Sequence, residues 1–104
     1  MKPLHLHDEV EADMEEIWDR IALDDSSVAD RFVDAVEKSF AQIGRHPGIG
    51  HRRRWRSRLL VEVRVWRVEG FRNHLVFYRE QEEFVAIIAV LSGQRSLERI
   101  LIKR

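Results

Sequence analysis

The clearest hydrophobic pattern lies between residues 61 and 91, where three apolar segments are separated by polar or glycine-containing connections. From Val61 to Val65, valines alternate with charged residues, which is typical of a strand with one buried face. Residues 75–78 form a second apolar segment, and residues 84–91 form an unbroken apolar run. Because a strand without a polar face belongs where both faces of a sheet are covered, the pattern predicts three strands with the last one central.

Two amphipathic helices are predicted before these strands, one over about residues 9–23 and one that follows the turn at residues 24–27 and runs to about residue 45. Asp8, followed three residues later by Glu11, resembles a capping pair for the first helix, and the polar turn at residues 24–27 supplies a cap for the second. Proline disfavours helix in the residue before it, so the Pro-Gly-Ile-Gly sequence at residues 47–50 predicts a sharp turn. The two helices are therefore expected to form an antiparallel hairpin.

Shorter elements are predicted near both ends of the chain. Leucines alternate with histidines over residues 4–7, which indicates a short strand that joins the sheet. Residues 51–58 are nearly all arginine and are interpreted as a loop or a frayed strand start. Val65 and Trp66 are both apolar, which marks either a β-bulge or the bend before the next turn. Residues 96–101 are typical of a short final helix that begins at a serine cap.

This order of elements indicates an α+β fold: an N-terminal strand, a helix hairpin packed on one face of a mainly antiparallel sheet (β-α-α-β-β-β), and a short C-terminal tail. The 104 residues are expected to form a single domain, residues 1–104. The helix hairpin is long enough to cover only one face of the sheet. We therefore expect a second polypeptide to cover the other face.

The composition indicates which classes of protein the chain can belong to. With 44% hydrophobic and 35% charged residues, the chain is typical of a folded globular protein. It lacks an apolar run long enough to cross a bilayer, and Asp8 and Glu9 interrupt the region where a secretory signal would be apolar, so we expect a cytoplasmic protein. The absence of cysteine excludes disulfides and thiolate chemistry.

The charge is divided unevenly along the chain. Residues 1–40 hold four basic and twelve acidic side chains, whereas residues 41–104 hold fourteen basic and six acidic ones. Thirteen of those fourteen are arginines, whose planar guanidinium groups suit carboxylates and phosphates. Arginines around Trp55 would fit nucleic acid, but the acidic helices or an acidic partner would also neutralise them. Because the net charge is zero, no autonomous DNA binding is expected.

A metal site receives little support from the sequence. His5 and His7 share one side of the predicted first strand, but no third and fourth ligand follow at a recognisable spacing. We therefore predict no metal and no cofactor.

Several segments, taken in this order, resemble the ParE/RelE toxin superfamily of bacterial type II toxin-antitoxin modules. They are ADMEEIW at residues 12–18, ADRF at 29–32, HPGIG at 46–50, GFRNHLVFYR at 70–79 and VLSGQR at 90–95. The HPGIG element and the GFR sequence before the FYR strand are similar to the ParE branch in particular.

The resemblance implies a toxin that inhibits DNA gyrase, acts in plasmid stabilisation and is neutralised by a cognate antitoxin in a hetero-oligomer. The ParE branch carries no catalytic centre, so the resemblance points away from an enzyme. The residues expected to bind the antitoxin or the target are Arg58, Arg64, Trp66, Arg72 and Arg95.

Two alternatives remain open at this stage. The first is a RelE-like, ribosome-dependent mRNA endoribonuclease, whose candidate catalytic residues would be Arg72, Arg95, His74 and Tyr78. Either Glu62 or His74 would take the proton, and Tyr78 or His74 would supply one. Against it, aliphatic residues around Leu101 occupy the position where such nucleases place a stacking tyrosine. The second alternative is an inactive relative that only binds a partner.

Overall fold

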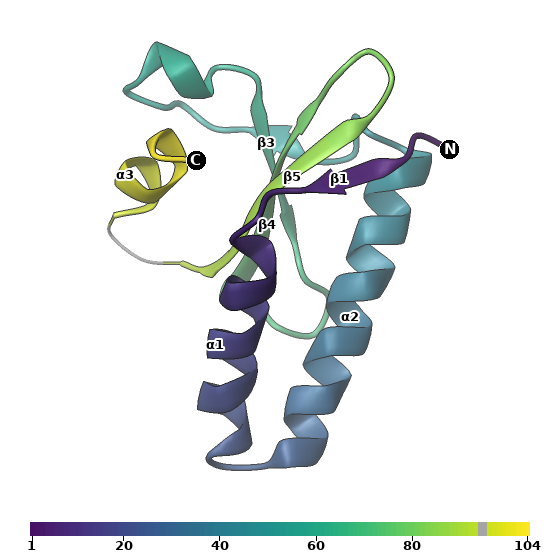
Figure 1. Ribbon diagram of the computed structural model, residues 1–104, viewed down its shortest axis with the longest axis vertical. Helices are drawn as coiled ribbons and strands as arrows, with labels where there is room; N and C mark the ends of the chain where they lie inside the picture. Colours follow the sequence, from purple (N-terminus) through teal and green to yellow (C-terminus); the bar gives the residue numbers. More distant parts are fainter. Residues whose placement is uncertain (94–95) are drawn as a thin grey trace.

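The computed structural model describes residues 1–93 and 96–104 (Figure 1). Its elements are β1 (Leu4–Leu6), α1 (Val10–Ala22), α2 (Ser26–Arg45), β2 (His51–Arg52), the 3-10 helix η1 (Arg58–Leu60), β3 (Val63–Arg67), β4 (His74–Glu80), β5 (Val85–Ser92) and α3 (Leu97–Ile102). Both long helices end within one residue of their predicted bounds. None of the helices in the described ranges has the length and apolar character needed to cross a membrane.

The strands form one five-stranded sheet in the order β1-β5-β4-β3-β2. β1 runs parallel to β5, with Leu4 opposite Val85, and the remaining neighbours are antiparallel. The apolar strand β5 therefore lies between two neighbours, as its sequence predicts, and the α+β fold class is confirmed.

The helix hairpin covers one face of this sheet (Figure 1). Asp25 is the N-cap of α2, and its side chain accepts hydrogen bonds from the backbone N–H groups of Ser27 and Val28. Large side chains of both helices, of β4 and β5, and of Val68 just after β3 form the core on this side. Its buried members are Val10, Ile17, Phe32, Val36, Ile43, Val68, Val76, Tyr78, Val85, Ile87 and Val90. Each fully buried Val, Ile or Phe stabilises the fold by about 1.5–3 kcal/mol.

The opposite face is covered by the chain itself, so the expectation that a second polypeptide must cover it is wrong. A second buried cluster lies there, made of Leu60, Val63, Val65, Phe77, Ile88, Ala89, Leu97 and Leu101. The cover comes from η1, from α3 and from Trp55, whose ring centroid lies 6.2 Å from that of Phe77. These are short elements, and a six-residue helix is stable only when it is docked.

Two local predictions are also wrong, the cap of α1 and the first residue of β3. Glu9, not Asp8, is the N-cap of α1, and its side chain makes no cap hydrogen bond within the described residues; instead, Glu9 N–H donates to Nδ1 of His7. Of the two alternatives at Val65 and Trp66, the β-bulge is absent, because Trp66 pairs regularly and the register shift lies between Phe77 and Tyr78, whereas the bend agrees with the end of β3 at Arg67 before the turn at Gly70. β3 begins at Val63, because Val61 belongs to the end of η1, where it is 59% exposed.

Candidate interaction site

An apolar hollow of about 560 Å³ opens on the second face, between β1, β5, η1 and α3. Three of the large hydrophobic side chains that line it are exposed: Leu59 at 68%, Leu6 at 50% and Ile102 at 43%. Leu60, Ile88 and Leu101 form its buried floor. Exposed aliphatic side chains around a concave surface are typical of a site that another molecule covers.

The rim of the hollow is mostly basic. Arg79 donates from Nη2 to the Leu59 carbonyl oxygen at 2.9 Å, which places its guanidinium beside η1. Glu62 lies on the same rim and pairs with Arg52 at 3.2 Å. His5 stacks on Phe84, with ring centroids 4.2 Å apart. An apolar floor with cationic neighbours suits an amphipathic, acidic segment.

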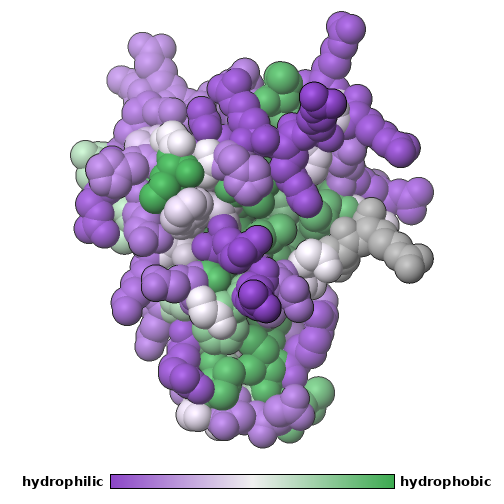
Figure 2. Space-filling view, turned by 180° about the vertical axis from the view of Figure 1, so that it is seen from behind, coloured by the Kyte–Doolittle hydropathy of each residue, from purple (hydrophilic) through white to green (hydrophobic). Residues whose placement is uncertain are grey.

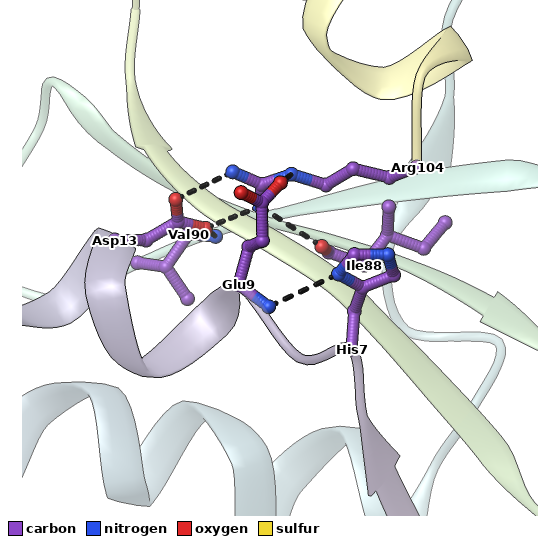
Figure 3. Close-up of polar contacts among 6 residues, drawn as sticks. All are labelled: His7, Glu9, Asp13, Ile88, Val90 and Arg104. Carbon is purple, nitrogen blue, oxygen red and sulfur yellow. Dashed lines mark hydrogen bonds and ion pairs between the residues drawn. The ribbon is translucent and has the colours of Figure 1, made fainter.

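Arg104, which lines the hollow just after the end of α3, forms an ion pair with Asp13 of α1 (Figure 3). Arg104 donates from Nη2 to Oδ1 of Asp13 at 2.7 Å and from Nη1 to Oδ2 of the same carboxylate, in a bidentate arrangement. Both side chains are only 8% exposed. Glu9 approaches Nε of Arg104 at 3.4 Å. The hydrogen bonds to Asp13 raise the pKa of Arg104 above its ordinary value.

Arg104 and Asp13 also form hydrogen bonds with the part of the β5 edge that β1 does not reach. The β1–β5 pairing ends where Leu6 meets Ile87. Past that point, Arg104 Nη1 donates to the Ile88 carbonyl oxygen at 3.1 Å, and Asp13 Oδ2 accepts the Val90 N–H at 3.1 Å. Two backbone groups that a longer β1 would have paired are thus satisfied by side chains.

Sequence reasoning missed this pair, because its members are 91 positions apart. A partial signal did exist. Asp13 lies three residues after Val10 and four before Ile17, both of which are buried, so an acidic residue sits beside the apolar stripe of α1. A carboxylate in that position needs a buried partner.

The structure does not bring the predicted binding residues together. Arg58 is exposed on η1, near the hollow. Arg64 lies on the helix-covered face of β3 and donates to the Gly50 carbonyl oxygen at 2.7 Å; Trp66, on the same face, donates to Gln42 at 3.0 Å. Arg72 occupies the turn between β3 and β4, and Arg95 lies outside the described residues. Their roles in binding stay predictions.

Two of the candidate nuclease residues, Tyr78 and His74, have engaged side chains, and Arg95 lies outside the described residues. The Tyr78 hydroxyl is buried; it donates to the Pro47 carbonyl oxygen at 2.7 Å and accepts the Gly50 N–H at 2.8 Å. Burial raises the pKa of Tyr78. The His74 ring packs 5.0 Å from that of Phe32, and burial lowers the pKa of His74. Tyr78 therefore fixes the turn at residues 47–50 and is not placed to protonate a leaving group.

The histidines of the first strand have local partners. His5 stacks on Phe84, and His7 Nδ1 accepts the Glu9 N–H at 3.1 Å. Within residues 1–93 and 96–104, no group of three His, Asp or Glu side chains is arranged to hold a metal ion.

The chain is similar to known proteins in both sequence and fold. The family described as the ParE toxin of the type II toxin-antitoxin system, parDE, matches residues 4–97. Among solved structures, the "Chromosomal ParDE TA system from P. aeruginosa" has a similar fold, with a TM-score of 0.72 and 17% identity over 90% of this chain and 98% of that one. No curated protein matched the sequence. Since the family match spans nearly all of the described fold, the chain belongs to the ParE toxin family of type II toxin-antitoxin systems.

Proposed function

We propose that this ParE-family toxin inhibits DNA gyrase and that a cognate antitoxin neutralises it in a cytoplasmic hetero-oligomer. The family match over residues 4–97 carries this proposal. It agrees with the order of ParE-like motifs along the chain, from the acidic first helix to the strand that ends in Phe77, Tyr78 and Arg79.

We further propose that inhibition works through binding and without catalysis. Cleavage of RNA at a 2′-hydroxyl needs a group that takes a proton and a group that gives one. The Tyr78 hydroxyl is hydrogen-bonded on both sides, and the His74 ring is packed between aromatic rings. The arginines stay protonated, so they can stabilise negative charge but cannot exchange protons. These contacts favour a surface that binds its target intact.

The apolar hollow is the proposed binding site of the antitoxin. Leu59 and Ile102 would accept its aliphatic side chains, and Arg58 and Arg79 on or beside η1 would meet its carboxylates. Arg64 is a poor candidate for this contact because its guanidinium is bonded to the turn at Gly48 and Gly50. Neutralisation would follow if the bound segment occludes the surface that meets gyrase.

A supercoiling assay with purified gyrase tests the first part. Adding the protein should inhibit supercoiling and trap cleaved DNA, and adding the antitoxin should restore activity. Leu59→Lys places a charge in the hollow and should weaken antitoxin rescue, whereas Leu23→Lys, a similar change at an 86% exposed leucine, should not. Uninhibited gyrase at micromolar protein would contradict the proposal. Codon-position cuts in translated messages would instead favour the endoribonuclease, and harmless overexpression would favour an inactive relative.

A further inference from the structure

The arginine-rich loop before η1 has a fixed backbone. The carboxylate of Glu98, on α3, accepts the backbone N–H of Arg56 at 3.1 Å and that of Ser57 at 3.0 Å. These hydrogen bonds lower the pKa of Glu98. Glu98 therefore holds the loop against α3 through backbone groups and leaves the arginine side chains free to point outward.

Trp55 anchors the middle of the loop. Its indole Nε1 donates to the Val63 carbonyl oxygen at 3.4 Å, and its ring packs near Phe77. The guanidinium of Arg53 lies 5.6 Å from the centre of the indole ring. Because the indole is partly buried and Arg53 lies over its ring, less of the ring is open to stack on a nucleic-acid base.

We name the arginines displayed by this scaffold the arginine platform: Arg53, Arg54, Arg56, Arg58 and Arg99. All five are exposed, and none of them has a carboxylate within ion-pair distance among the described residues. The nearby acids are engaged elsewhere, Glu98 with the loop backbone and Glu62 with Arg52.

The loop and η1, which carry four of the five platform arginines, lie at the opposite end of the molecule from the α1–α2 turn. In Figure 1, the α1–α2 turn is at the bottom, and η1 with its preceding loop is at the top. Seen from behind, long hydrophilic side chains project from the upper part of the molecule (Figure 2). The charge split of the sequence thus becomes a split between two ends in space, which would orient the platform toward a polyanion.

The zero net charge predicts no autonomous DNA binding, but the positive charge is concentrated locally, and against that expectation we infer that the arginine platform binds the phosphate backbone of a nucleic-acid duplex. Protein interfaces have an apolar centre, whereas residues 52–58 hold one apolar side chain, that of Trp55, whose indole donates to the Val63 carbonyl oxygen; the exposed Leu59 and Val61 follow this segment. Interfaces with nucleic acid are polar and strongly positive, as the surface of the five arginines is. Single strands are held by stacking on exposed aromatic rings, and the one aromatic ring of residues 52–58 is partly buried, so the duplex is the better fit.

Fluorescence anisotropy with short labelled DNA and RNA duplexes tests this inference without gyrase or antitoxin. If three arginines each neutralise one phosphate, raising the salt concentration fourfold should weaken binding about 40-fold. The variant Arg54→Gln/Arg56→Gln/Arg99→Gln should lose most of the affinity and of the salt dependence on both duplexes. Circular dichroism establishes that each variant is folded.

The matched control is Arg31→Gln/Lys38→Gln/Arg45→Gln, which removes the same charge from exposed positions of α2. Its duplex affinity should stay close to that of the wild type. Equal losses in the two triple variants would overturn the inference, since net charge alone would then explain binding. So would tighter binding of single strands than of duplexes, or platform-dependent binding of polyglutamate without binding of either duplex.

Discussion

The buried pair of Arg104 and Asp13 gives the most demanding test of the structure. In Arg104→Ala, the Asp13 carboxylate stays in an environment where its side chain is 8% exposed, with the Val90 N–H as its remaining hydrogen-bond donor among the described residues. The Ile88 carbonyl oxygen loses its side-chain donor in the same step. The substitution thus removes the countercharge and reopens the edge of β5.

The expected magnitude follows from the burial of both partners. Removing one member of a buried ion pair costs about 3–5 kcal/mol, because the other charge is left uncompensated. A domain of this size is stable by about 5–15 kcal/mol, so the loss is a large fraction of the total. Replacing both members, in Asp13→Leu/Arg104→Met, should cost much less than the sum of the two single changes, because neither charge is then buried alone.

Urea unfolding followed by circular dichroism measures these differences. The control is Arg20→Ala, which breaks an exposed pair with Glu16 and should cost less than about 0.5 kcal/mol. If the midpoint of Arg104→Ala falls as little as that of the control, the pair contributes no more than a surface pair. That result would refute the reasoning.

Two further predictions concern the helix-covered face. A Cβ at Gly50 would lie 2.7 Å from the Tyr78 hydroxyl oxygen and 2.9 Å from the Val65 carbonyl oxygen, so Gly50→Ala should lower the free energy of unfolding by about 1–3 kcal/mol; an unchanged denaturation midpoint would contradict this. Burial lowers the pKa of His74 below 6.5, so the unfolded chain binds that proton more readily and stability should fall as the pH drops below 6.5. His74→Leu should flatten this dependence in unfolding titrations at several pH values, and a slope equal to that of the wild type would rule His74 out.

The helices and the three long strands could be predicted because their signals are local. The apolar stripe of α2 repeats at helical spacing over several turns, and the unbroken apolar run of β5 has the short length of a strand. η1 carries no such signal, and the short pattern of α3 predicts a helix but not where that helix packs. Their burial depends on contacts with strands distant in sequence, such as those of Leu60 and Leu101 with the second cluster, and a local pattern does not record such contacts.

The candidate site was harder to predict for a related reason. Alternation in β3 separates Val63 and Val65 from Arg64 and Trp66, and the structure keeps that separation. The alternation does not indicate which face of β3 packs against the helix hairpin and which packs against η1 and α3. The valines pack in the cluster under η1 and α3, so Arg64 and Trp66 come to lie on the side of α2. Arg64, which the sequence predicts as a binding residue, is therefore hydrogen-bonded to the turn before β2.

α3 links the two proposed surfaces. Leu101 and Ile102 line the hollow, Glu98 fixes the backbone of the arginine-rich loop, and Arg104 joins the end of the helix to α1 and β5. Six residues do not make a stable helix alone, so these contacts must supply the order that helix propensity does not. We therefore expect that a partner which shifts α3 would change the shape of the hollow and the position of the arginines together, so that binding at one surface would alter the affinity of the other.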